Sequence, residues 1–280
     1  MTRDAAPAEA VAVDRIEAGR IGTGPPVAFI LGLAPASDMG SWQRARQRRF
    51  LRPLAAQFSV AAMTLRAVPP PGATMQDLAA AHAAALRSTF SGPADLLGVS
   101  TGGAIALQLA LDQPALVRRL VLIATGPRLS LAGARACARC ADLIEAGRPV
   151  AGLAALADMM PHAIARTALR WTFRLGAVAV GAGRRWDPLL VARALRAELA
   201  FDATARLAAL AMPVLLIAGD RDPCYDIADV RHAAARIADA RLVTYAAGHF
   251  GVVTQRRLWP DVVAFLAARA QSTRIASPGT

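Results

Sequence analysis

The chain has 280 residues, of which 55% are hydrophobic, so it is long enough to bury one large core or two small ones. Its formal net charge of +12 comes from 32 basic residues, all of them arginine, while aromatic residues make up only 5% of the chain. No zinc-finger spacing or RNA-binding signature accompanies this charge, so we attribute it to composition and expect no nucleic-acid partner.

Cysteine usage and the search for targeting segments together indicate a cellular compartment. Cys137, Cys140 and Cys224 are too few for a disulfide framework in a chain of this length. Cys137 and Cys140 form a CxxC inside a helical pattern with no second pair nearby, and we expect them to pack in a helix rather than bind metal. Since neither a signal peptide nor a membrane-spanning segment is predicted, we expect a cytoplasmic protein without stable membrane insertion.

Short apolar runs that end in glycine, proline or polar residues predict six buried strands, at 27–33, 58–66, 94–100, 118–126, 212–220 and 240–248. Helical spacing predicts helices at 74–90, 102–112, 227–238 and 252–268, and a solvated helix face over the arginines of 44–52. Buried strands that alternate with amphipathic helices indicate an α/β domain with a mostly parallel sheet and helices on both faces. Residues 127–210 interrupt this alternation, and we interpret them as several short inserted helices.

One serine lies at an abrupt junction between a predicted strand and a predicted helix. Ser100 is flanked by Gly98 and Gly102 in the pattern Gly-x-Ser-x-Gly. A turn tight enough to expose a serine hydroxyl crowds the positions two before and two after it, and glycine relieves that crowding. The N-terminus of the helix that follows also favours developing negative charge. The pattern therefore predicts a nucleophile.

A serine of ordinary pKa needs a base, and the base needs a carboxylate to orient it. Among the four histidines, only His249 directly follows a predicted strand, at the end of the sheet where α/β sites lie. Asp220, Asp222 and Asp226 follow the preceding strand. We choose Asp222, because Asp220 is better placed to cap the turn and Asp226 to cap the next helix.

The order Ser100, Asp222, His249 and the motifs "GVSTGG", "GDRDP" and "GHFGVV" resemble the α/β-hydrolase superfamily over residues 27–268. The resemblance implies an α/β-hydrolase core at 1–126 and 211–270, a helical cap at 127–210 and a disordered tail at 271–280. It also implies an oxyanion hole formed by the backbone N–H groups of Leu33 and Thr101.

Two segments depart from the pattern of the family. Leu31 stands where histidine is common in the oxyanion loop, and "TLRAVPPPG" replaces a frequent Asp-x-Arg-Gly-x-Gly. Neither position supplies the nucleophile, the base or the acid, so the departures bear on the subfamily rather than on the chemistry.

These residues predict a serine hydrolase that cleaves a small to medium hydrophobic ester with no metal and no organic cofactor. A thioesterase or a C–C bond hydrolase on the same triad remains open, as does a non-catalytic ligand-binding protein with this fold. The arginines of the cap are compatible with a basic entrance to the substrate pocket or with solvent-facing charges that only keep the protein soluble. The sequence leaves homo-oligomerisation open.

Overall fold

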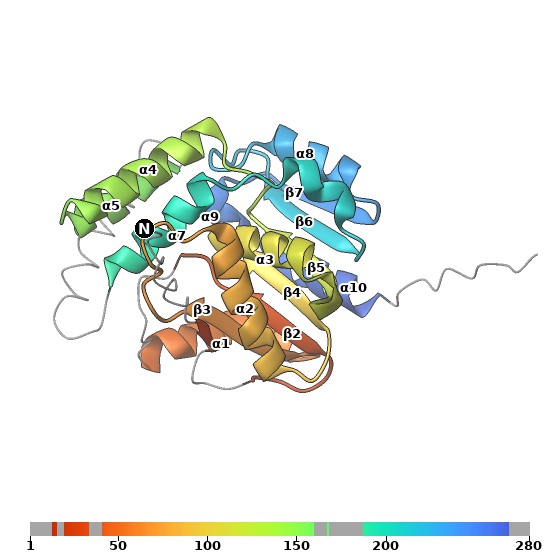
Figure 1. Ribbon diagram of the computed structural model, residues 1–280. Coiled ribbons are helices and arrows are strands. Elements are labelled where there is room, and N and C mark those ends of the chain that lie inside the picture. Colours follow the sequence, from red (N-terminus) through yellow and green to blue (C-terminus); the bar gives the residue numbers. More distant parts are fainter. Residues whose placement is uncertain (1–12, 16–19, 34–40, 160–166, 168–186, 269–280) are drawn as a thin grey trace, which may run out of the picture.

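The computed structural model describes residues 13–15, 20–33, 41–159, 167 and 187–268, and they build one seven-stranded sheet (Figure 1). Its strands are β1 (Val13–Arg15), β2 (Pro26–Ile30), β3 (Ser59–Leu65), β4 (Ala94–Val99), β5 (Val117–Ile123), β6 (Val214–Gly219) and β7 (Ala240–Tyr245). The spatial order is β1-β3-β2-β4-β5-β6-β7, and only β1 runs antiparallel to its neighbour.

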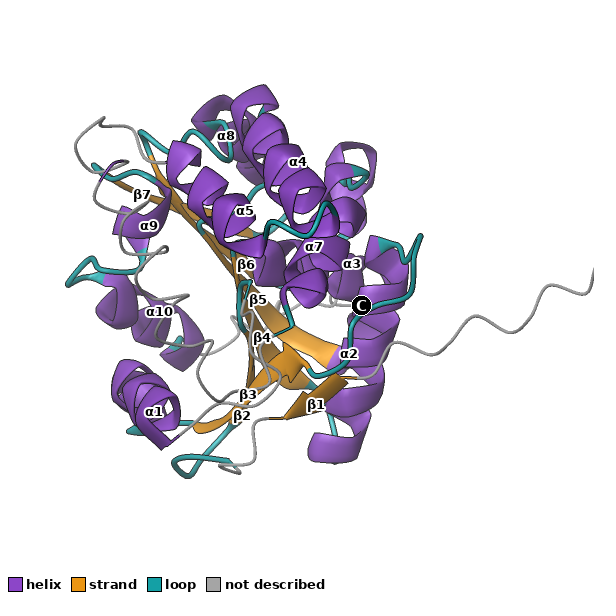
Figure 2. Cartoon of the chain, turned by 90° about the vertical axis from the view of Figure 1, so that its left-hand side faces the viewer, coloured by secondary structure: helices purple, strands orange, loops and turns teal. Residues whose placement is uncertain are grey.

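Helices cover both faces of this sheet (Figure 2). One face carries α1 (Ser41–Ala55), α9 (His249–Val252) and α10 (Leu258–Ala267), and the other carries α2 (Met75–Thr89), α3 (Thr101–Asp112) and α8 (Ile227–Arg236). Successive strand residues supply the two cores in turn: Phe29 of β2 packs under α1 and α10, whereas Ile30 belongs to the core on the other face. Alternation of this kind requires strands that are apolar on both sides, as the sequence predicted.

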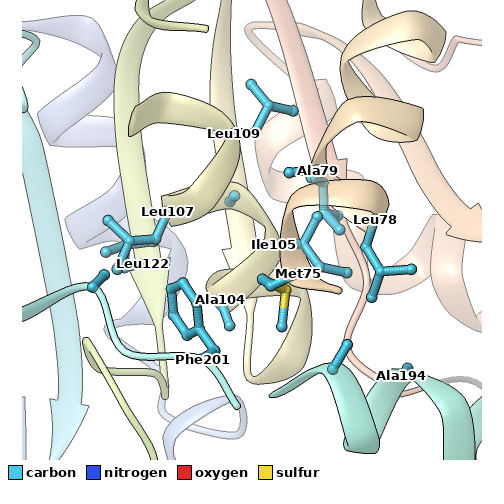
Figure 3. Close-up of a cluster of buried hydrophobic side chains, with 14 of the residues drawn as sticks. Met75, Leu78, Ala79, Ala104, Ile105, Leu107, Leu109, Leu122, Ala194 and Phe201 are labelled. Carbon is cyan, nitrogen blue, oxygen red and sulfur yellow. The ribbon is translucent and has the colours of Figure 1, made fainter. Parts of the chain in front are cut away.

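The segment between β5 and β6 is helical and packs on the second face of the sheet. It contains α4 (Leu131–Glu145), α5 (Pro149–Ala155), α7 (Pro188–Leu199) and the 3₁₀ turns η2 (Leu156–Met159) and η3 (Thr204–Ala209). Figure 3 shows how α7 joins the core: Ala194 lies beside Met75 and Leu78 of α2 and Ile105 of α3. The α/β architecture with helices on both faces is thus the one that the sequence predicted.

Two details of the fold differ from the prediction. The helix expected at 252–268 begins only at Leu258, as α10, and Val252 instead ends the separate short helix α9. Pro260 has no N–H to donate to a preceding turn and is tolerated only within the first turn of a helix, so α10 cannot begin much earlier. The short edge strand β1 was not predicted, since three residues are too few to show a period.

Several predictions fall outside the described residues, namely the tail at 271–280 and the cap arginines Arg166, Arg170, Arg174, Arg184 and Arg185. Within the described part of the chain, no helix combines the length and apolarity needed to cross a membrane.

Candidate active site

Ser100 occupies the turn between β4 and α3, in a backbone conformation that side chains rarely adopt. Its φ is 54° and its ψ is −127°, a region that costs on the order of 1–3 kcal/mol. The flanking glycines make the turn possible: a Cβ on Gly98 would lie 2.3 Å from the carbonyl oxygen of Gly102, and one on Gly102 would lie 2.4 Å from that of Leu31. Strand, turn and helix therefore pack too closely for any side chain at these two positions.

Ser100 is the first member of a chain of three side chains that come from three strand ends. Its Oγ lies 2.9 Å from Nε2 of His249, which follows β7, and Nδ1 of His249 lies 2.8 Å from Oδ2 of Asp222, which follows β6. A carboxylate can only accept, so Nδ1 of His249 carries the proton and Nε2 is left to accept from the serine hydroxyl. His249 and Asp222 are 5% and 9% exposed, so this relay is shielded from water.

The carboxylate of Asp222 is fixed by its own loop. Its Oδ1 accepts hydrogen bonds from the backbone N–H groups of Cys224 at 2.7 Å and Tyr225 at 3.4 Å, which leaves Oδ2 for His249. The two neighbouring acids do not contact His249 in the described structure. Asp226 is the N-cap of α8 and accepts a hydrogen bond from the N–H of Ala228, as the sequence predicted. Asp220 is exposed and pairs with Arg221.

Helix α4 of the inserted segment is hydrogen-bonded to the loop that carries Asp222. Ser130, its N-cap, donates through Oγ to the carbonyl of Pro223 at 2.5 Å and through its backbone N–H to the carbonyl of Cys224 at 2.9 Å. Cys137 of α4 lies against Cys224, and this contact together with burial raises the pKa of the Cys224 thiol. The described residues include no group of three or more His, Cys, Asp or Glu side chains that could hold a metal ion.

The two predicted oxyanion donors border the same cavity. Leu33 and Thr101 line one small cavity beside Ser100, together with Gly32, where an added Cβ would lie 3.5 Å from the Cβ of Ser100. Thr101 is the first residue of α3, a position where a backbone N–H has no partner within the helix. This end of the helix also favours negative charge.

One buried acid at the site was not predicted from the sequence. Glu198 of α7 is 2% exposed, and it accepts a hydrogen bond from the Thr101 hydroxyl at 2.6 Å and another from the Tyr225 hydroxyl. Burial raises the pKa of Glu198, and the hydrogen bonds from Thr101 and Tyr225 and the nearby His249 act in the opposite direction. Glu198 thereby links the inserted segment to the residue after Ser100 and to the loop that carries Asp222.

A signal for Glu198 was present in the sequence. It lies three residues after Leu195 and seven after Val191, on the stripe of α7 that is otherwise apolar and buried. An acid on such a stripe must find partners, because an unpaired buried carboxyl group is costly. The partners, Thr101 and Tyr225, are 97 and 27 residues away in the chain and could not be named in advance.

Comparison with protein families gives one match that covers most of the chain. The model described as "Alpha/beta hydrolase family" matches residues 29–259. Among curated proteins, the chain is 33% identical over 184 residues to polyketide synthase ThaQ of Burkholderia thailandensis. This match covers 62% of the chain but only 8% of that synthase, so it concerns a small part of a much longer protein.

Solved structures of similar fold are numerous. A hydrolase from Pseudomonas aeruginosa PA01 is 23% identical with a TM-score of 0.68, over 92% of this chain and 94% of the other. The enol-lactonase from Burkholderia xenovorans LB400 is 21% identical with a TM-score of 0.66, over 94% and 100%. A thermophilic esterase from Thermogutta terrifontis is 22% identical with a TM-score of 0.68, over 91% and 92%. At these identities the likeness establishes the fold.

Proposed function

Since the chain belongs to the alpha/beta hydrolase family, a family of enzymes that act on ester and related bonds, we propose that it is a serine hydrolase. Its substrate is a small to medium hydrophobic carboxylic ester, and the reaction proceeds through an acyl-enzyme on Ser100. The observation that carries the proposal is the continuous relay from Ser100 Oγ to His249 to Asp222, with donor–acceptor distances of 2.9 and 2.8 Å.

In the first half of the reaction, Ser100 Oγ attacks the ester carbonyl carbon while His249 Nε2 takes the hydroxyl proton. Asp222 holds the imidazole in the required tautomer and stabilises the positive charge that His249 gains. The tetrahedral intermediate then collapses, and His249 passes the same proton to the departing alcohol oxygen. The acyl group remains bound to Ser100.

In the second half, His249 takes a proton from water, and the resulting hydroxide attacks the acyl carbon. Collapse of this second intermediate returns the proton from His249 to Ser100 Oγ and releases the acid. The N–H groups of Leu33 and Thr101 stabilise the oxyanion in both halves, and a donor of this type contributes about 3 kcal/mol in enzymes where it has been removed. No step requires a metal or an organic cofactor.

The inserted helices between β5 and β6 act in this proposal as a cap that selects the substrate. Their described part presents apolar residues of α7 near the cavity beside Ser100, which supports a hydrophobic acyl group. A serine nucleophile distinguishes this site from relatives that attack through a carboxylate.

A thioester is the second candidate substrate, and the match to a segment of a polyketide synthase favours it. The same serine, base and oxyanion donors would attack a thioester carbonyl in the same way, and the leaving group would be a thiol. A C–C bond hydrolase and a non-catalytic ligand-binding protein are the remaining alternatives, and an intact relay argues against the latter.

The test is labelling with a fluorophosphonate probe, which forms a covalent adduct with an activated serine. We expect an adduct on the native protein and none on Ser100→Ala or His249→Ala, with Ser88→Ala, an exposed serine of α2, as the matched control. A series of p-nitrophenyl esters and of acyl thioesters then compares the two substrate classes. Labelling that persists in Ser100→Ala would contradict the proposal.

A further inference from the structure

A second buried histidine lies on the side of Ser100 away from His249. His82 lies in the middle of α2, is fully buried, and places Nδ1 2.8 Å from the backbone carbonyl of Leu78. A carbonyl oxygen can only accept, so Nδ1 carries the proton and Nε2 has a free lone pair. Among the described residues, Nε2 of His82 has no hydrogen-bond partner.

An unpaired buried acceptor of this kind costs on the order of 1–3 kcal/mol, so it calls for a partner outside the described protein atoms. Burial lowers the pKa of His82 to about 4, so the ring is neutral at neutral pH and Nε2 is an acceptor rather than a donor. The missing partner is therefore a hydrogen-bond donor.

The cavity beside Ser100 is where that partner can bind. His82 lines it together with Thr64 at the end of β3, the loop residues 31–33 and Thr101. Ile105 of α3 and Ala194 of α7, which lie close together in Figure 3, close it with apolar surface. Its volume of about 20 Å³ is room for one group the size of a water molecule.

We propose that this cavity is a subsite for a hydroxyl group on the acyl part of the substrate, which donates its hydrogen bond to Nε2 of His82. The inference rests on the proposed function, because Leu33 and Thr101 line the cavity and are also the proposed donors to the carbonyl oxygen. In this proposal the hydroxyl lies on the acyl side of the scissile bond, within a few atoms of the carbonyl carbon.

The lining disfavours the charged alternatives to a hydroxyl. A carboxylate has only acceptor oxygens, and the lone pair of Nε2 would repel it. An ammonium group could donate, but the described lining of the cavity contains no carboxylate to offset the loss of its hydration. A neutral hydroxyl needs only the one acceptor that is present.

The test compares p-nitrophenyl butyrate with the 2-hydroxy and 3-hydroxy esters on the native protein and on His82→Leu. Leucine has a similar size and no acceptor. We expect the ratio of kcat/KM between the better hydroxy ester and the plain ester to fall about fivefold to tenfold in His82→Leu, while kcat/KM for plain butyrate stays within about twofold. His232→Leu, on the exposed face of α8, is the matched control and should leave the ratio unchanged.

Two outcomes would overturn the subsite. An unchanged ratio in His82→Leu means that the cavity holds only a water molecule, and an equal loss for all esters means that His82 only packs. Both leave the serine hydrolase proposal standing, whereas a native protein that shows neither fluorophosphonate labelling nor ester cleavage contradicts that proposal.

A second measurement tests the subsite without turnover. In the Ser100→Ala variant, nitrogen-15 NMR of histidine follows the Nε2 resonance of His82 while the ester is added. We expect this resonance to shift with the preferred hydroxy ester and to stay in place with plain butyrate. No difference between the two esters would refute the subsite even in a variant without activity.

Discussion

Two buried histidines flank the Ser100 turn, and they differ in how completely their nitrogens are partnered. His249, beyond β6 and β7, has Ser100 Oγ on one nitrogen and Asp222 on the other. His82, on the side of β2 and β3, has the Leu78 carbonyl on one nitrogen and no described partner on the other. Among the described residues, one hydrogen-bonding network is thus complete and the other is not.

This difference separates two tasks within one site. A relay that transfers protons must hold its geometry before the substrate arrives, and the ring of His249 is accordingly packed by Tyr225 and Phe250 with centroids 5.8 and 5.3 Å away. A group that recognises the substrate must keep a hydrogen bond free for it. The largest effects of mutation are therefore expected on the side of His249.

Removal of each histidine in turn tests this difference directly. We expect His249→Ala to lower kcat/KM toward p-nitrophenyl butyrate by about 10⁴-fold or more, because the base is lost, and His82→Leu to change it by less than about twofold. Steady-state kinetics on both variants check this. Comparable losses in the two variants would show that both histidines serve the chemical step.

Asp222→Asn tests whether the relay depends on the orienting carboxylate. An amide can donate to Nδ1, which would place the imidazole proton on Nε2 and remove the base, so we expect kcat to fall by about 10³- to 10⁴-fold with KM little changed. Asp220→Asn, at an exposed position two residues earlier, is the matched control and should retain activity within about twofold. Loss of activity in Asp220→Asn instead would move the acid to that residue.

The sequence could predict the architecture and the residues around His249, because both follow from local patterns. Ser100 lies in a five-residue motif, and Asp222 and His249 each follow a buried apolar strand, so the topology of a parallel sheet alone brings them to one edge. The chain of contacts that links Glu198 to Thr101 and Tyr225 depends instead on how α7 packs, and no local pattern encodes it. The free Nε2 of His82 is likewise a property of packing: in the sequence His82 was one histidine in an alanine-rich helix.

Titration of His82 should make the free energy of unfolding depend on pH. Burial lowers its pKa from 6.5 to about 4, so the unfolded chain binds a proton at this residue below pH 6.5 that the folded chain does not bind. The free energy of unfolding should therefore fall by about 3 kcal/mol between pH 6.5 and pH 4 from this residue alone. Urea unfolding of the native protein and His82→Leu at both pH values measures it.

Between pH 6.5 and pH 4, we expect the loss of unfolding free energy to be about 3 kcal/mol smaller in His82→Leu than in the native protein. In His232→Leu the loss should equal that of the native protein. A His82→Leu variant that loses as much stability at pH 4 as the native protein would mean that His82 is protonated in the folded state as readily as in the unfolded chain.

The effect of Glu198 on the pH dependence of stability has the opposite sign to that of His82. Burial raises the pKa of Glu198, so the folded chain keeps a proton here that the unfolded chain loses above pH 4.5. The contribution of Glu198 to stability is therefore largest below pH 4.5 and declines as the pH rises through the folded-state pKa. Glu198→Gln cannot ionise and should lack this decline, while kcat/KM falls by less than about tenfold, because glutamine keeps a carbonyl oxygen for one of the two hydroxyl donors.

Glu145→Gln is the matched control for Glu198→Gln, because Glu145 of α4 forms an exposed ion pair with Arg196 of α7. Urea unfolding from pH 4 to pH 8 should give a difference between Glu198→Gln and the native protein that grows with pH, whereas the difference for Glu145→Gln should not grow in this way. A constant difference for Glu198→Gln would mean that the carboxyl group is already ionised in the folded protein across this range. In that case Glu198 would place a fixed negative charge near His249, and its effect would appear in the pH profile of kcat rather than in stability.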